Sequence, residues 1–432
     1  MRKTIQVEND SASAFSRRLI NWAKQNNVFV LLNSNGFNTA GSTHEYDFLA
    51  AFGVADSIIT SSENAFGELD KFYNAKKDWI FGHLTYDLKN GIEALSSNNP
   101  DGIDFPDMFF FQPEYVILSK NRQVEMQYMH NIEEDSARKI LNEIFSLPDT
   151  IFPGVNEDFT MVSRYSKKEY LDTVSQLKKH IQKGDIYEVN FCQEFYSQAS
   201  IDPYYIYNQL NELSPAPFSG FYKLNDKYLI SSSPERFLKK KGGKVISQPI
   251  KGTAPRGSVE DEDNQIKQRL LQDVKERAEN VMIVDLVRND LARSAKKDTV
   301  KVDELFGIYS FKQVYQMIST ISAEIHPRNA VKCLKNAFPM GSMTGAPKIK
   351  AMELIERYER TKRGLYSGSI GYFTPEGDFD FSVIIRSILY TENQKYISYT
   401  VGGAITHLCS PETEYEECMV KAKAMKKVLN YQ

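Results

Sequence analysis

The sequence predicts a mixed α/β or α+β fold with large β-sheets. Short runs of β-branched and aromatic residues predict strands, and longer stretches with apolar residues at helical spacing predict helices. After about residue 160 the two kinds of segment alternate irregularly along the chain. This mixture favours large sheets over a helical bundle.

The first third of the chain contains predicted strands at residues 28–32 (VFVLL) and 108–111 (MFFF), and a predicted helix at residues 136–145. Residues 147–154 (LPDTIFPG) combine two prolines and a glycine with polar neighbours, a composition typical of a connection between structural units. The sequence therefore predicts two regions, residues 1–150 and residues 160–432.

In the second region, residues 167–182 predict a helix, because Tyr170, Val174 and Leu177 recur at helical spacing and Gly184 follows as a stop. A longer helix is expected from about residue 263 to residue 292. Strands are expected at residues 186–191, 228–231 and 381–385.

Composition excludes several classes of protein. The 432 residues carry a formal charge of −3 with 41% hydrophobic and 25% charged residues, so we expect a globular protein without a nucleic-acid partner. The four cysteines have no metal-binding spacing, and no apolar run is long enough for a membrane span. A cytoplasmic protein with reduced thiols and no membrane contact is expected.

Acidic side chains on two predicted helices are candidates for a metal site. Glu279 borders the apolar stripe of the long helix, and a single glutamate there is more often solvated than functional. In the C-terminal helix, Glu414, Glu417 and Lys421 share one face at positions i, i+3 and i+7. Carboxylate oxygens suit Mg²⁺, although acids near a helix N-terminus also complement the helix dipole.

Other segments indicate a small anionic substrate. Lys251 lies in an apolar turn at residues 249–253 (PIKGT). Arg386 directly follows the apolar run at residues 383–385 (VII). A guanidinium at the end of a buried strand usually needs a carboxylate or phosphate partner. Glycines in residues 341–348 and at positions 402 and 403 could let the backbone approach a ligand.

Together these segments resemble the chorismate-utilising enzyme family, over essentially the whole chain. The motifs that carry the resemblance are residues 232–237 (SSPERF), 249–253 (PIKGT), 284–290 (VDLVRND) after Glu279, 341–348 (GSMTGAPK), and 414–417 (EYEE) with Lys421. The resemblance implies an anthranilate synthase component I-like fold, with two large β-sheet layers and helices packed on the outside. Residues 1–150 would be its N-terminal region, and residues 160–432 its chorismate-binding catalytic region.

The resemblance also implies roles for individual residues. Glu279 and Glu417 match Mg²⁺ ligands, with Glu414 near the metal through water. Glu235 matches the acid or base that works on the ring hydroxyl of chorismate. The positions that match contacts to the chorismate carboxylates are Gly252, Thr253, Tyr366, Arg386, Gly402, Gly403 and Lys421.

Two positions separate the branches of this family. Family members that add water have a lysine where this chain has Glu188, and anthranilate synthases have alanine where this chain has Lys251. A lysine in the turn is the mark of the aminodeoxychorismate synthases, in which it attacks ring carbon C2 and ammonia then enters at C4. For this chemistry we expect a lowered pKa for Lys251 and a raised pKa for Glu235.

The same branch implies a partner. The chain has no Gly-x-Cys-x-Gly nucleophile turn, so a separate glutaminase subunit would supply ammonia to make 4-amino-4-deoxychorismate, a precursor of 4-aminobenzoate and folate. Two alternatives remain open: an anthranilate synthase component I, and a non-catalytic homologue that binds chorismate or a partner. Gln316, which replaces a histidine frequent in the family, keeps the second alternative open.

Overall fold

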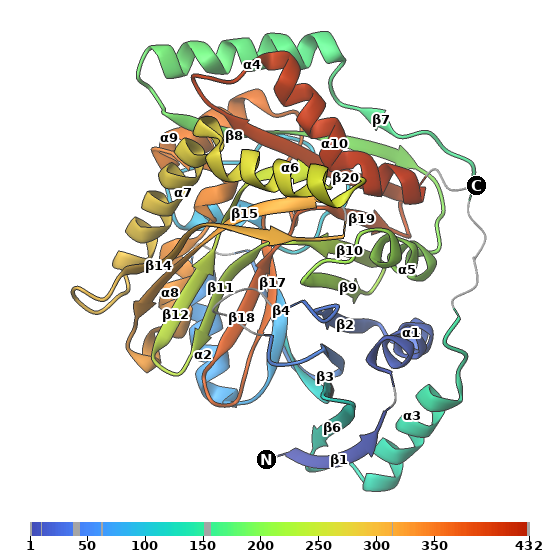
Figure 1. Cartoon of the computed structure of the whole chain (residues 1–432). Coiled ribbons are helices and arrows are strands. Elements are labelled where there is room, and N and C mark those ends of the chain that lie inside the picture. The colour runs from blue at the N-terminus through green and yellow to red at the C-terminus, as the bar shows by residue number, and fades with distance from the viewer. Residues whose placement is uncertain are drawn as a thin grey trace.

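In the computed structural model, residues 2–9, 11–37, 44–61, 64–150, 157–312 and 314–429 are described. Their strands join through antiparallel pairings into one hydrogen-bonded network. The network folds into two layers that face each other, with helices on the outer side of each layer (Figure 1). This architecture confirms the predicted α+β fold.

The first layer is a continuous series of paired strands that starts at the N-terminal β1 and ends at β8. In order of pairing its strands are β1 (Arg2–Glu8), β6 (Gln123–Met129), β5 (Met108–Lys120), β3 (Phe48–Thr60), β2 (Val28–Asn33), β9 (Phe218–Leu224), β10 (Lys227–Ser233), β19 (Ser387–Thr391), β20 (Tyr396–Ile405) and β8 (Glu188–Gln198), with β7 (Val162–Ser163) and β16 (Gly345–Ala346) at its edge.

The second layer starts from the first half of β5, since that long strand continues from one layer into the other. Its remaining strands are β4 (Ile80–Leu84), β17 (Ser369–Phe373), β18 (Phe379–Val383), β11 (Arg236–Lys241), β12 (Lys244–Gln248), β15 (Val314–Glu324), β13 (Ile250–Pro255) and β14 (Lys301–Ser310).

Alternation along the strands separates three large apolar cores, and a fourth, smaller cluster packs α6 (Glu260–Gln272) against β15. In β2, Val30 faces the core between the two layers, whereas Phe29 and Leu31 face the helices outside. The outer core of the first layer packs α1 (Ala12–Trp22), α3 (Glu134–Ser146), α4 (Lys167–Gln182), α5 (Pro203–Leu213), α9 (Lys348–Tyr358) and α10 (Pro411–Leu429). The outer core of the second layer packs α2 (Ala65–Lys76), α7 (Val274–Ala292) and α8 (Ala330–Ala337).

Local signals fix some helix boundaries well. The helix predicted at residues 167–182 is confirmed as α4, whose N-terminus is closed by a capping box between Ser166 and Glu169. The single helix expected over residues 263–292 is wrong. The chain forms α6 (Glu260–Gln272) and α7 instead, because Asp273 adopts an extended conformation and its side chain accepts a hydrogen bond from the backbone N–H of Glu276.

The predicted division of the chain stays a prediction. Its connecting segment falls partly on residues 151–156, which lie outside the described residues. Strands from the two regions pair directly, β2 with β9 and β4 with β17. None of the helices in the described residues combines the length and the hydrophobicity of a transmembrane span.

Candidate active site

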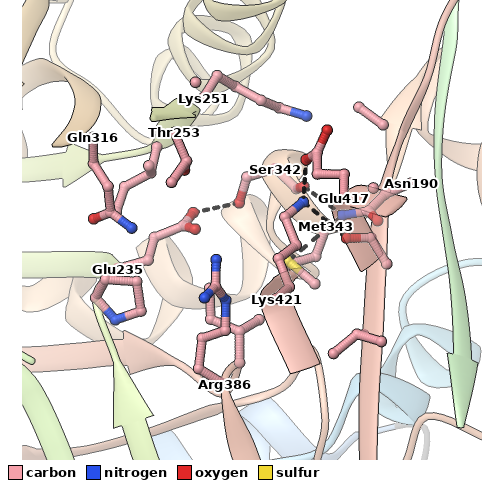
Figure 2. A pocket seen from close by; sticks show the side chains of 18 of the residues that line it. Asn190, Glu235, Lys251, Thr253, Gln316, Ser342, Met343, Arg386, Glu417 and Lys421 are labelled. Carbon is pink, nitrogen blue, oxygen red and sulfur yellow. Dashed lines mark hydrogen bonds and ion pairs between the residues drawn. The ribbon is translucent and has the colours of Figure 1, made fainter. Parts of the chain in front are cut away.

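One pocket brings together segments that lie far apart in the sequence (Figure 2). Strand β13, the turn between β10 and β11, helix α7, strand β20 and helix α10 all contribute to its wall. Every residue that the sequence singled out for a site lines it: Glu235, Lys251, Gly252, Thr253, Glu279, Tyr366, Arg386, Gly402, Gly403, Glu414, Glu417 and Lys421.

Glu235 is a buried carboxylic acid that lines this pocket. It follows β10, where the chain turns into β11, and the hydroxyl of Ser342 donates a 2.5 Å hydrogen bond to its Oε1 (Figure 2). Burial raises the pKa of Glu235 to about 7, against the lowering effect of Ser342 and of the cations Lys251 and Lys421. Near neutral pH a large fraction of Glu235 is therefore protonated, in agreement with the expected raised pKa.

Lys251 lies on β13 and is paired with a second glutamate. Its Nζ donates a hydrogen bond to Glu188 Oε1 at 2.8 Å, and the two side chains are 10% and 1% exposed. Burial by itself lowers the pKa of Lys251, but Glu188, Glu279 and Glu235 together raise it above its ordinary value. The expected lowered pKa is therefore wrong for this structure, because the acids around the ammonium outweigh its desolvation.

Two helices supply an acidic wall. Glu276 and Glu279 project from α7, and Glu414 and Glu417 project from α10. Burial raises the pKa of Glu279 to about 7. The carboxylates lie close to the backbone of β20, since a Cβ added at Gly403 would lie 3.0 Å from Glu414 Oε2 and 3.9 Å from Glu417 Oε1.

Two lysines balance this acidic wall. Lys275 lies 3.0 Å from Glu414 and 3.7 Å from Glu279, and Lys421 lies 2.6 Å from Glu417. Among the described residues no three acidic, histidine or cysteine side chains converge as a ready set of metal ligands. The donors are nonetheless all carboxylate oxygens, from α7 and α10, that line one pocket. Carboxylate oxygens are the donor type that Mg²⁺ prefers, so the residues present fit that ion chemically.

Cationic groups form another part of the pocket. Arg386 follows β18 with a backbone φ of +52°, an uncommon value for a residue with a side chain. Its guanidinium points into the pocket, and in the described part of the chain it has no ion pair (Figure 2). Lys421 donates a 2.9 Å hydrogen bond to the carbonyl oxygen of Gly402. Arg386 and Lys421 can therefore receive the carboxylates of an anionic ligand.

The sequence did not single out several polar residues of the pocket. Asn190 is held by a 2.9 Å hydrogen bond that its side chain donates to the carbonyl of Ser342, and Thr400 also lines the pocket. Gln316, which the sequence marked only as a departure from the family pattern, is 3% exposed. Its Oε1 has no hydrogen-bond partner among the described residues. A buried amide oxygen of this kind is available to a donor on a bound ligand.

Comparisons with known proteins identify the family of the chain. The model of the family described as chorismate binding enzyme matches residues 28–427. Anthranilate synthase component 1 of Thermus thermophilus is 33% identical over 357 residues, which cover 81% of this chain and 77% of that relative. Aminodeoxychorismate synthase component 1 of Bacillus subtilis is 32% identical over 359 residues, which cover 81% and 76%. The protein of that name from Salmonella typhimurium is 35% identical over 341 residues, which cover 79% and 74%.

Solved structures show the same fold at low sequence identity. Anthranilate synthase component I from Streptococcus pneumoniae has a TM-score of 0.73 and 23% identity, and the match covers 98% of this chain and 92% of that one. MenF, the menaquinone-specific isochorismate synthase from Escherichia coli, has a TM-score of 0.76 and 16% identity, with 99% and 95% covered. With the family match over nearly the whole length, the chain belongs to the chorismate binding enzymes.

Proposed function

We propose that this chain is the chorismate-aminating component of an aminodeoxychorismate synthase, which converts chorismate and ammonia to 4-amino-4-deoxychorismate. One observation carries the choice of reaction: a buried lysine, Lys251, lies in the same pocket as a buried acid, Glu235, whose pKa is raised to about 7. A nucleophile and a proton donor are the two groups that the replacement of a ring hydroxyl requires.

The cationic side of the pocket would bind and orient the substrate. Chorismate carries two carboxylates, and Arg386 and Lys421 are the charged donors placed to receive them. Tyr366, Thr253 and the backbone at Gly402 and Gly403 complete the wall around them. This arrangement would hold the ring with C2 toward Lys251 and the C4 hydroxyl toward Glu235.

The reaction would then proceed in two displacements. The neutral amine of Lys251 adds to C2, the two ring double bonds shift, and the C4 hydroxyl leaves as water with the proton of Glu235. Ammonia next adds to C4, the double bonds shift back, and the nitrogen of Lys251 leaves as an amine. The surplus proton of the new C4 ammonium returns to Glu235, so the site is restored and water is the second product.

A magnesium ion would be held by Glu279 and Glu417, with Glu414 nearby. When bound, Mg²⁺ supplies Lewis-acid polarisation and a fixed anchor for the carboxylate on the ring. Lys275 and Lys421 now neutralise these acids, so binding of the ion requires the two ammonium groups to release or share their partners.

Ammonia would come from a separate glutaminase subunit. Component 1 in the names of several relatives implies such a second component. The cysteines of this chain offer no nucleophile of their own: all four are buried, and burial raises the pKa of Cys192 to about 12 and that of Cys418 to about 11.

Anthranilate synthase is the second candidate, because relatives with that name match this chain as well as the aminodeoxychorismate synthases do. The test is product identification by mass spectrometry after incubation of the purified chain with chorismate, Mg²⁺ and an ammonium salt. We expect 4-amino-4-deoxychorismate. Anthranilate would place the new nitrogen at C2 and overturn the proposal, and isochorismate would show water as the nucleophile.

A further inference from the structure

Glu188 is a buried acid outside the motifs that define the site, and it holds the amine of Lys251. It starts β8, where its backbone pairs with Ala346 of β16, and a Cβ added at Gly345 would lie 2.2 Å from the Glu188 carbonyl oxygen. This close backbone packing fixes the position of Glu188. The side chain is 1% exposed, and Oε1 accepts the 2.8 Å hydrogen bond from Lys251.

Within the described residues, this contact is the hydrogen bond and ion pair that the Lys251 amine and the Glu188 carboxylate make with each other. Glu188 Oε2 has no hydrogen-bond partner in the described part of the chain, and no other hydrogen bond or ion pair of Lys251 occurs there. A buried carboxylate that faces one ammonium needs the positive charge to offset its own desolvation. The pair is therefore expected to persist as an ion pair while the pocket holds no ligand.

Other charged groups act on Lys251 from a greater distance. Glu235 after β10 and Glu279 on α7 raise the pKa of Lys251 together with Glu188, and Glu276 on α7 and Glu417 on α10 also interact with its charge. The other charged or titratable groups that line the same pocket are Glu414, Lys421, Arg386 and Tyr366. None of these groups lies within ion-pair distance of the Lys251 amine in the described residues, whereas Glu188 does. Removal of the Glu188 carboxylate should therefore change the electrostatic potential at the Lys251 amine more than removal of any of these other groups.

We propose that Glu188 is a positioning residue for Lys251, which aims the amine at the pocket and keeps it as an ammonium until the proton is passed to the Glu188 carboxylate. The catalytic role of Glu188 rests on the proposed function, whereas the ion pair between Glu188 and Lys251 does not depend on it. The proton would move from Nζ to Oε1 before the bond between nitrogen and C2 forms, and would return after ammonia has expelled the lysine. Neither transfer changes the balance of the overall reaction.

The direct test is the titration of Lys251 in the folded protein without substrate. A small amine-acylating reagent is applied over a range of pH in metal-free buffer, and mass spectrometry of the peptide with residue 251 gives the labelled fraction. We expect Lys251 to label with a pKa above that of exposed lysines such as Lys423 in the same digest, and Glu188→Gln to lower its labelling pKa by at least about one unit. Glutamine keeps the volume and the acceptor oxygen but removes the charge.

Activity gives the second readout. Glu188→Gln should move the acid limb of kcat/KM to lower pH by a similar amount, with KM for chorismate within about threefold of wild type. Glu188→Ala, which also removes the acceptor, should lower kcat more than about tenfold at every pH, since the amine is no longer aimed. Asp378→Asn is the matched control, because Asp378 forms a 3.0 Å ion pair with the buried Lys240 and neither residue lines the pocket. It should leave the pH profile unchanged.

The outcomes separate the two claims. If Lys251 of the wild type labels like an exposed lysine, or if Glu188→Gln does not change its labelling pKa, the claim that Glu188 holds Lys251 as an ammonium is wrong. If the labelling pKa shifts but the rate profile stays in place, Lys251 is not the titrating nucleophile, and the lysine step of the proposed function fails while the pair stands.

Discussion

At the scale of single residues, burial has opposite consequences for the two groups that would do the chemistry. Glu235 lies against Ser342 and within the influence of two cations, yet desolvation prevails and its pKa rises to about 7. Lys251 is also buried, but the acids around it prevail and its pKa rises as well. Both groups therefore favour their protonated forms near neutral pH. Protonated Glu235 can act as an acid, whereas protonated Lys251 must lose a proton before it can act as a nucleophile.

Glu235 gives a pH-dependent prediction. Its folded pKa of about 7 lies above the ordinary 4.5. The contribution of the neutral side chain to the free energy of unfolding is therefore fully present below about pH 4.5, and it is lost as pH rises through about 7. Glu235→Gln should therefore be more stable than wild type at pH 8.5, by up to about 3 kcal/mol, and nearly equal at pH 4. Urea unfolding at both pH values measures the difference; an equal gain at pH 4 would show a packing effect instead.

The same substitution tests catalysis. Without a proton for the leaving hydroxyl, Glu235→Gln should lower kcat by about 10²- to 10⁴-fold, with KM for chorismate much less affected. Steady-state kinetics with ammonium as the nitrogen source measures both constants. A variant that keeps its kcat would remove Glu235 from the role of general acid.

At the scale of elements, the close approach of β20 to α10 depends on a missing side chain. A Cβ at Gly403 would lie 3.0 Å from Glu414 Oε2, and Glu414 cannot move freely, because it is 1% exposed and paired with Lys275 at 3.0 Å. Gly403→Ala should therefore raise the Mg²⁺ concentration needed for half-maximal turnover. Gly243→Ala is the control, since its Cβ would meet only the Ile325 carbonyl oxygen at 3.9 Å. A Gly403→Ala protein with unchanged Mg²⁺ dependence would contradict the proposed position of the metal.

Prediction from sequence succeeded for elements whose signals are local. The helix at residues 167–182 has its cap, its apolar face and its stop within one continuous stretch, so its bounds could be read directly. The break at Asp273 was missed, although an aspartate three residues before Glu276 is a helix-start signal. The apolar spacing that continues across the break concealed it.

The site was predicted unevenly for a similar reason. Its motifs could be recognised, but the partner of Lys251 could not, because Glu188 lies 63 residues away and its side chain meets Lys251 only in the folded protein. Charge balance is a property of the assembled pocket. The sign of the Lys251 pKa shift was therefore misjudged from the sequence, whereas that of Glu235, which follows from burial alone, was not.

At the scale of the whole molecule, α7 and α10 come from distant parts of the chain, and Lys275 of α7 reaches Glu414 of α10 at 3.0 Å. A cation bound between their carboxylates would join the two helices. Mg²⁺ should therefore stabilise the fold, by about 3 kcal/mol at a hundredfold excess over its dissociation constant, and a chelator should abolish turnover without unfolding the protein. Denaturant unfolding with and without Mg²⁺ measures the effect. Glu417→Gln should weaken it, and Glu416→Gln, an exposed neighbour on the same helix, should not.

The most direct test of the account is the product that Lys251→Ala makes from chorismate, Mg²⁺ and an ammonium salt, identified by chromatography and mass spectrometry beside the wild type. Alanine leaves C2 open and removes the nucleophile, so we predict that 4-amino-4-deoxychorismate is no longer formed. Circular dichroism checks that the variant is folded. Full formation of the 4-amino product by the folded variant would contradict the central claim that Lys251 directs the nitrogen to C4.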